Sequence, residues 1–339
     1  MSRAGPLNLI TDVAGLKVGQ AEDAAVRTGV TVLLPDDRAV CAVDVRGGAP
    51  GTRETDALAA DTLVEAVDAI VLAGGSVYGL AAADGVTALL GARQRGFRLA
   101  ASSAAPVSPV IPAAILYDLA NGGSKDWGLE TPYRALGMAA AEAAGERFSL
   151  GTAGAGYGAM AGRLKGGVGS ASAVSEDGFT VGALAAVNSF GSAVAPGTRA
   201  FWAAPFEVGD EFGALGAGDL RAAPGDWGQF KGAPATAREN TTIACVATDA
   251  VLTPAEARRV AVMAQDGMAR ALRPVHTPFD GDVVFVLATG RHEIQGPRPM
   301  TIARVGALAA DCLARAIARG VYEATPWPGT EVGCWRDLR

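Results

Sequence analysis

The stretch ARENTTIACVATDA, residues 237–250, changes from a loop into a strand near its middle. Residues as far as Asn240 are mostly polar, whereas those that follow are small, β-branched or apolar and predict a buried strand. This strand would begin with two adjacent hydroxyls, Thr241 and Thr242. One interpretation is that the asparagine ends a turn and that threonine suits the first positions of a strand. The other is that the peptide bond before Thr241 can be cut, which would make Thr241 a new N-terminus with its own base.

The composition describes a globular protein rather than a membrane protein or a nucleic-acid-binding one. Of the 339 residues, 50% are hydrophobic, and the formal net charge of −6 is opposite to the basic surface that nucleic acids require. No apolar run approaches the roughly 18 residues of a membrane span, and the first residues lack the long apolar core of a secretory signal. The 4 cysteines are widely spaced, which is typical of free thiols in a reducing compartment. We therefore expect a cytoplasmic protein with neither nucleic acid nor membrane as a partner.

Apolar runs separated by glycine-rich or charged turns predict an α/β protein. The expected strands after residue 240 are apolar on both faces, so they belong to a sheet that is covered on both sides. Between 197 and 240 the chain is rich in Gly, Pro and aromatic residues without a period, which indicates a functional or mobile connection. We interpret the chain as stacked sheets with helices outside, an α/β layered sandwich. Strands are expected at 29–35 and 39–48 (as neighbours joined by a turn), at 69–73, up to Tyr117, through Asn188, and at 241–251 and 282–290. Helices are expected to end near 95 and to cover 131–145, 253–272 with Thr253 as N-cap, and about 301–319.

Asp280 and Asp282 precede the last apolar strand and lie two residues apart, so in an extended segment both carboxylates point to the same face. A charge at the mouth of a buried strand must be paired or hydrogen-bonded. The pair either caps the strand in an Asp-Gly-Asp turn or orients a nucleophile and shares a proton near it. A metal site would need further ligands, and although His276 is near in sequence, the chain has only 2 histidines. We expect neither a metal nor another cofactor.

A threonine hydroxyl becomes a nucleophile only when a base takes its proton. The sequence has no G-x-S-x-G motif and no histidine in an obvious supporting motif. A freed α-amino group, with a pKa of about 8, would serve as that base at neutral pH. Before cleavage, the hydroxyl of Thr241 could attack the carbonyl of Asn240 and give an ester that water resolves.

Two glycine-rich segments are candidate ligand sites. AGGSVYG, residues 73–79, follows an expected strand, but it lacks the G-x-G-x-x-G order and a Walker lysine, which favours a packing turn over a nucleotide site. In LKGGVG, residues 164–169, Lys165 stands among glycines that cannot shield its charge. That is unusual for a surface lysine and indicates a cation aimed into a cleft.

Nine segments occur in an order that resembles one family across nearly the whole chain. They are ITDVAGLKVG, GVTVLLP, AVDVRGGAPGTRETD, LAGGSVYGL, PAAILYDL, LKGGVGSAS, VNSFGS, ENTTIACVATDA and HTPFDGDVVFVLATG. Their order resembles the DmpA-type self-processing aminopeptidases, which are N-terminal-nucleophile hydrolases. It is most similar to the nylon-oligomer branch of that family, the 6-aminohexanoate-oligomer endohydrolases.

The resemblance implies a cofactor-free amide hydrolase on an αββα sandwich. It implies a single domain, residues 1–339, that cuts itself into a large fragment, 1–240, and a small fragment, 241–339, which stay together. It further implies a small amide or peptide substrate and a homo-oligomer, a tetramer of processed heterodimers. Asn240 and Thr241 match the scissile pair of the family, with threonine as in the nylon-oligomer branch. Asp280 and Asp282 match the two carboxylates of that branch, where the aminopeptidases have a serine and a glutamate.

Three further site residues are implied by the same resemblance. Asn188 matches an asparagine near the nucleophile, Tyr117 a tyrosine that lines the cleft, and Lys165 the active-site lysine, with Arg163 as the alternative cation. Asn188 and Lys165 would stabilise the oxyanion, and Tyr117 would hydrogen-bond the acyl intermediate or the substrate amine.

The leading hypothesis is therefore a hydrolase that acts inside short amide oligomers. The close alternative is an aminopeptidase that releases N-terminal residues from short or β-amino peptides. Two hypotheses of other classes stay open: a small-molecule binding protein without turnover, and a nucleotide-binding enzyme that uses the glycine-rich segment 73–79.

Overall fold

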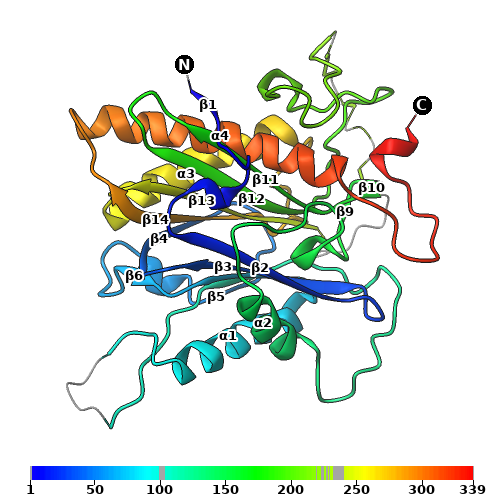
Figure 1. Cartoon of the computed structure of the whole chain (residues 1–339). Coiled ribbons are helices and arrows are strands. Elements are labelled where there is room, and N and C mark those ends of the chain that lie inside the picture. Colours follow the sequence, from blue (N-terminus) through cyan, green and yellow to red (C-terminus); the bar gives the residue numbers. More distant parts are fainter. Residues whose placement is uncertain are drawn as a thin grey trace.

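A computed structural model describes residues 2–98, 104–218, 220–222, 225–226, 228, 230–231 and 240–338. In this part of the chain, two β-sheets are stacked between two pairs of helices (Figure 1). The four layers confirm the predicted αββα sandwich.

The larger sheet contains the strand that the opening stretch predicts. Its strand order is β1-β11-β12-β13-β14-β4-β6, and β13 and β14 are parallel to each other while the other neighbours are antiparallel. The sheet is therefore centred on two strands that follow residue 240, with strands from before residue 240 on both sides. The bounds are β1 Arg3–Ala4, β4 Ala39–Val45, β6 Ala66–Val67, β11 Val168–Val174, β12 Thr180–Asn188, β13 Thr241–Ala250 and β14 Val283–His292.

The smaller sheet has the order β2-β3-β7-β8-β5. Its members are β2 Leu16–Asp23, β3 Thr28–Pro35, β5 Thr52–Arg53, β7 Ile70–Ala73 and β8 Ala113–Ile115, and β9 Met160–Ala161 and β10 Leu164–Lys165 form a separate hairpin. The expected strands at 29–35 and 39–48 exist as β3 and β4, but the prediction that they are neighbours is wrong, because they lie in different sheets. Both sheets are covered on both faces, so the two strands carry the same apolar pattern and the turn between them crosses from one layer to the other.

Two helix pairs cover the outer faces of the sheets. Helices α3 Pro254–Ala271 and α4 Arg298–Tyr322 pack on the larger sheet, and α1 Ala81–Ala92 and α2 Tyr133–Glu142 on the smaller one (Figure 1). Thr253 caps α3 as predicted: its hydroxyl accepts from the N–H of Glu256 at 3.3 Å, and the Glu256 carboxylate accepts from the N–H of Thr253 at 2.8 Å. Short 3-10 helices are η1 Ile10–Asp12, η2 Asp56–Leu58, η3 Ser76–Leu80, η4 Gly154–Gly156, η5 Ala204–Phe206 and η6 Trp335–Asp337.

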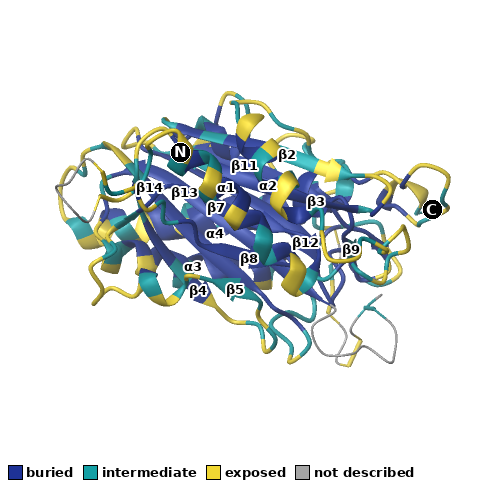
Figure 2. Ribbon diagram, turned by 90° about the horizontal axis from the view of Figure 1, so that it is seen from below, coloured by how far each residue is buried: buried dark blue, intermediate teal, exposed yellow. Residues whose placement is uncertain are grey.

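The side chains of β13 alternate between two hydrophobic layers. Ile243 and Cys245 face the layer between the sheets, whereas Ala244 and Val246 face α3 and α4. The central strands β12 and β13 are buried along their whole length, and exposed residues collect mainly on loops and outer helix faces (Figure 2). Each large apolar side chain in such a layer contributes about 1.5–3 kcal/mol. Separation of residues 241–339 from the rest would thus expose a large apolar surface.

The connection that precedes the junction is only partly described. The predicted irregular segment 197–240 contains the 3-10 helix η5, and residues 232–239 lie outside the described residues. The four cysteines are buried and unpaired, as the sequence predicts. None of the helices in the described ranges combines the length and apolar character that crossing a bilayer requires.

Candidate active site

Five of the predicted site residues meet where the central strands of the larger sheet begin or end. Asn188 is the last residue of β12 and lies directly opposite Thr241, the first residue of β13. Asn240 forms a parallel bridge with Asp280, and Asp282 directly precedes β14. The strand register thus brings together residues that are far apart in the sequence.

The peptide bond between Asn240 and Thr241 is buried and held by two donors. The hydroxyl of Thr241 donates to the carbonyl oxygen of Asn240, and the backbone N–H of Gly281 donates to the same oxygen at 2.9 Å. Thr241 is only 2% exposed. A Cβ atom at Gly281 would lie 2.7 Å from the hydroxyl oxygen of Thr241, so only glycine leaves room for that hydroxyl. A nucleophile candidate and a carbonyl with an N–H donor are therefore in contact.

The carboxylate of Asp280 is buried and accepts three hydrogen bonds. Its Oδ1 accepts from the N–H of Phe190 at 3.1 Å, and its Oδ2 accepts from the N–H and the hydroxyl of Thr277 at 3.0 and 2.5 Å. Burial, and then the charge of Asp282, raise the pKa of Asp280.

The carboxylate of Asp282 reaches β13. Its Oδ1 accepts from the N–H of Thr242 at 2.8 Å. Within the described residues, no hydrogen bond joins Asp280 or Asp282 to the hydroxyl of Thr241 in the intact chain. The Asp282 carboxylate instead holds the backbone directly after Thr241, and the Asp280 carboxylate holds the segments of Phe190 and Thr277.

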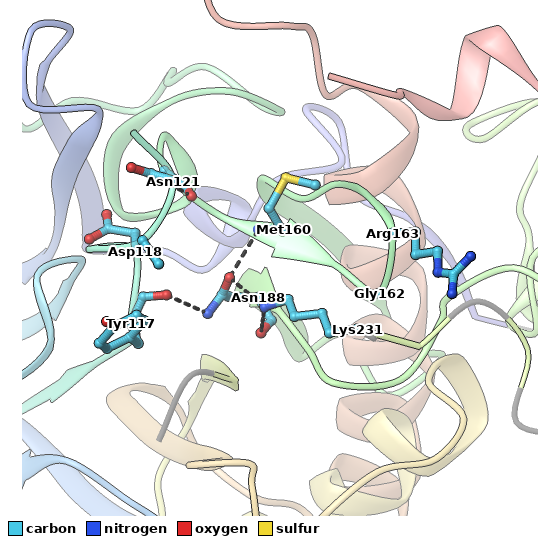
Figure 3. A pocket seen from close by; sticks show the side chains of 10 residues that line it. Tyr117, Asp118, Asn121, Met160, Gly162, Arg163, Asn188 and Lys231 are labelled. Atoms are coloured by element: carbon cyan, nitrogen blue, oxygen red, sulfur yellow. Dashed lines mark hydrogen bonds between the residues drawn. The ribbon is translucent and has the colours of Figure 1, made fainter. Parts of the chain in front are cut away.

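The amide of Asn188 is fixed from three directions (Figure 3). Its Nδ2 donates to the carbonyl oxygen of Tyr117 at 2.9 Å, and its Oδ1 accepts from the N–H of Met160 at 2.9 Å and from the ammonium of Lys231 at 3.0 Å. Asn188 therefore has one orientation; it pairs with Thr241 in the sheet and lines a pocket.

That pocket has a volume of about 270 Å³ and an apolar and polar lining (Figure 3). Its lining includes Tyr117 and Asn188 and the cations Arg163 and Lys231. Thr241 is not among the lining residues, whereas Asn188, which pairs with Thr241 in the sheet, is one of them.

The pocket also includes one buried acid, Asp118. Its Oδ1 accepts from the N–H of Gly75 and its Oδ2 from the hydroxyl of Thr28, both at 2.7 Å. Burial raises the pKa of Asp118 to about 6, against these two hydrogen bonds, which lower it. This carboxyl group can therefore change its charge in a mildly acidic solution.

Lys165 is buried and is not among the residues that line this pocket. The expectation that its glycine neighbours leave the charge unshielded is wrong, because the side chain is 0% exposed. Its ammonium donates to the carbonyl oxygens of Gly156 at 3.3 Å and Gly166 at 2.7 Å, and it lies 5.0 Å from the ring centroid of Trp327. Burial lowers the pKa of Lys165 to about 7. Of the two cations weighed from the sequence, Arg163 lines the pocket and Lys165 does not.

Three residues that take part in this geometry were not expected from the sequence. Gly281 supplies its N–H to the Asn240 carbonyl, Lys231 bonds Asn188, and the ring Nδ1 of His276 lies 2.9 Å from Asp282 Oδ2. For Gly281, its place between two aspartates was the only local signal in the sequence. Lys231 belongs to a segment without hydrophobic periodicity, so no signal in the sequence pointed to it. Among the residues that the structure describes, no group of 3 or more His, Cys, Asp or Glu side chains is placed to hold a metal ion.

With this geometry established, the family follows from comparison with known proteins. The sequence matches the model of peptidase family S58 over residues 8–333. The chain belongs to peptidase family S58. This S58 chain is 45% identical to a protein named uncharacterized aminopeptidase from Mycobacterium tuberculosis, over 98% of each chain. It is 31% identical to the 6-aminohexanoate-oligomer endohydrolase of Kocuria sp., over 82% of this chain and 74% of that protein.

Solved structures place the S58 chain in the same fold. The beta-aminopeptidase of Burkholderia sp. is similar with a TM-score of 0.72 and 22% identity, over 100% of this chain and 94% of that one. The L-aminopeptidase D-Ala-esterase/amidase of Ochrobactrum anthropi, described as a variant of the Ntn-hydrolase fold, has a TM-score of 0.69 and 21% identity, over 98% and 91%. The predicted family and fold are confirmed, and the protein is a hydrolase that acts on peptide or amide bonds.

Proposed function

We propose that this S58 peptidase cuts itself before Thr241 and then hydrolyses short amides with Thr241 as its N-terminal nucleophile. The observation that carries the proposal is the junction, where the carbonyl oxygen of Asn240 accepts hydrogen bonds from the hydroxyl of Thr241 and from the N–H of Gly281. The hydroxyl is thus next to the carbonyl it would attack, and a donor is already aimed at the oxygen that would become negative.

The cleavage step converts one peptide bond into an ester. The hydroxyl oxygen of Thr241 bonds to the carbonyl carbon of Asn240, the bond from that carbon to nitrogen breaks, and the nitrogen takes the hydroxyl proton. Water then hydrolyses the ester, which leaves a carboxylate on Asn240 and a free amine on Thr241. The N–H of Gly281 stabilises the oxyanion, a contribution of about 3–4 kcal/mol for one such donor.

Unsatisfied polar groups at the junction favour cleavage. Neither Oδ1 nor Nδ2 of the buried Asn240 side chain has a hydrogen-bond partner among the described residues. Such a group costs about 1–3 kcal/mol, and this cost is relieved when Asn240 becomes a chain end that can move.

Hydrogen-bond partners and strand register distinguish Thr241 from Thr242. The hydroxyl of Thr242 is buried with no partner in the described chain, and Thr242 lies opposite Val187 rather than Asn188. Only Thr241 therefore combines a nearby carbonyl with a position next to the pocket.

In the hydrolytic step the freed α-amine of Thr241 is the general base. It accepts the hydroxyl proton while the oxygen attacks the substrate carbonyl, and the amide nitrogen leaves with a proton before water resolves the acyl-threonine ester. Asp280 and Asp282 would hold the new ammonium group by their charge, and Asp282 also fixes the backbone N–H of Thr242 beside it.

The structure suggests different roles in hydrolysis for the other three predicted site residues. Asn188 would act as an oxyanion donor, and Tyr117 would contact the acyl chain, because both line the pocket. In the intact chain the ammonium of Lys165 bonds backbone carbonyls, so it would act on the oxyanion only after a rearrangement.

The pocket favours a short substrate. Its volume of about 270 Å³ is near the lower end of the range of small-molecule sites, which is roughly 300–1,000 Å³. A 6-aminohexanoate oligomer is the leading substrate, supported by the relative from Kocuria sp. and by the Asp-Gly-Asp sequence beside an Asn-Thr junction.

The aminopeptidase alternative is supported by a different observation. The pocket contains the carboxyl group of Asp118, which could hold a substrate amine, and the relative from M. tuberculosis carries the name aminopeptidase at 45% identity. Cleavage of amino-acid p-nitroanilides, with loss in Asp118→Asn, would favour this alternative over cleavage inside oligomers.

Intact mass measurement followed by two assays tests the proposal. We expect pieces 1–240 and 241–339 that copurify, and hydrolysis of 6-aminohexanoate oligomers or of an amino-acid p-nitroanilide. Thr241→Ala should remain one chain and be inactive. A wild-type protein that stays one chain of 34.1 kDa after prolonged incubation and hydrolyses neither substrate would refute the proposal.

A further inference from the structure

His276 contacts the carboxylate of Asp282 through both its backbone and its ring. Its backbone N–H donates to Oδ2 at 3.1 Å, and its ring Nδ1 lies 2.9 Å from the same oxygen. A carboxylate oxygen accepts this hydrogen bond when Nδ1 carries the proton, so we assign the proton to Nδ1 in this pair. The ring is thereby held in one orientation.

The backbone of His276 has the left-handed conformation, with φ at 55°. For a residue with a side chain this conformation costs about 1–2 kcal/mol, and it persists only where the surroundings impose it. A glycine would adopt it without strain, so the backbone alone gives no reason for an imidazole at this position. The hydrogen bonds from its backbone N–H and its ring Nδ1 to Asp282 hold His276 in this conformation.

Asp282 connects this histidine to the nucleophile strand. Its other oxygen, Oδ1, accepts from the N–H of Thr242 at 2.8 Å, directly after Thr241. The side chain of Asp282 is 1% exposed, whereas that of His276 is 20% exposed. Among the described residues, His276 is the only one whose side chain donates to Asp282.

We propose that His276 is a positioning residue of the hydrolytic site, whose Nδ1–H orients the carboxylate of Asp282 and so holds Thr241 in line. This inference rests on the proposed function, since the position of Thr241 matters to the rate only if Thr241 is the nucleophile. His276 touches neither Thr241 nor the pocket in this role and acts through Asp282 alone.

Two substitutions at this position separate the hydrogen bond from the backbone conformation. Both glycine and asparagine accept a positive φ, but only asparagine offers a side-chain N–H near the place of Nδ1. We expect His276→Gly to lower kcat roughly tenfold to hundredfold, the range for a lost hydrogen bond to a charged group, with KM changed by less than about threefold. His276→Asn should retain kcat within about threefold of the wild type.

The second histidine is a matched control. His292, at the end of β14, packs with its ring centroid 6.3 Å from that of Phe179 and is not part of the site. His292→Asn should therefore leave kcat and KM unchanged. Because the chain has only 2 histidines, this variant also leaves a single imidazole, whose ring-nitrogen NMR signals report His276 directly. We expect a protonated Nδ1 whose signal shifts when Asp282→Asn is added.

The outcomes separate the two proposals. If the wild type hydrolyses its substrate while His276→Gly keeps full kcat, or His276→Asn loses as much as His276→Gly, positioning by His276 is refuted and the proposed function stands. An imidazole protonated on Nε2 alone would refute it as well. If the wild type remains uncleaved and inactive, the proposed function fails, and positioning fails with it.

Discussion

Replacing Gly281 by alanine should slow self-cleavage without preventing folding. A Cβ atom there would lie 2.7 Å from the hydroxyl oxygen of Thr241, 2.8 Å from the carbonyl oxygen of Ala49 and 3.3 Å from Cα of Pro50. The contacts to Ala49 and Pro50 are to backbone, so the hydroxyl of Thr241 or the backbone at 281 has to move. Reaching ordinary contact at 3.4 Å requires the hydroxyl to shift by 3.4 minus 2.7, or 0.7 Å.

A displacement of this size is large for a reacting group. A misplacement of about 1 Å can cost roughly a hundredfold in rate, and the same movement weakens the N–H donation of Gly281 to the Asn240 carbonyl. We therefore expect the rate of cleavage of Gly281→Ala to fall by about a hundredfold. The crowding should also cost about 1–3 kcal/mol of folding free energy.

The assay follows the loss of the intact chain of 34.1 kDa by denaturing electrophoresis or intact mass, from the time of purification. Gly145→Ala is the control, because a Cβ atom at Gly145 would meet nothing within 4 Å and its φ is not positive. This control should be cleaved at the wild-type rate. If folded Gly281→Ala is also cleaved at the wild-type rate, the hydroxyl and the N–H donor are not the reacting groups.

Four further predictions follow from the same geometry. Thr241→Ala should abolish both cleavage and hydrolysis, whereas Thr242→Ala should retain cleavage; equal loss in both, measured by intact mass, would mean that the wrong hydroxyl has been assigned. Because burial raises the pKa of Asp118 from about 4 to about 6, its stabilising contribution is complete below pH 4 and is lost as the pH rises through 6. Asp118→Asn should therefore flatten the decline of Tm between pH 4 and 7, and an unchanged pH profile of Tm would contradict this assignment. Glu211→Gln breaks a buried 2.6 Å ion pair with Arg315 on α4 and should cost about 3–5 kcal/mol, seen as earlier separation of the two fragments in denaturant; no shift would show that this pair does not hold them together. EDTA should leave the hydrolytic rate unchanged, and activity that is lost on chelation and restored by added metal would refute the threonine mechanism.

Local patterns in the sequence predicted the elements and the reactive junction. The buried strand at 241–250 and the cap at Thr253 depend on neighbouring residues along one strand or one helix, and the structure confirms both. Asn240, Thr241 and the two aspartates also stand out locally, because each is a polar residue at the mouth of an apolar strand. Their roles in cleavage and hydrolysis stay predictions, as do the two-fragment state and the homo-oligomer.

Only the tertiary structure decided what these residues touch. Tertiary packing placed the sequence neighbours β3 and β4 in different sheets. It also brought together residues that are distant in the sequence, Lys165 with Trp327 and Lys231 with Asn188. The physical reason is that periodicity shows which side of an element is buried but not which partner covers it. The sequence pattern of an apolar strand is the same in either sheet. The sequence around Lys165 likewise does not show that the indole of Trp327, 162 residues later in the chain, packs against its ammonium group.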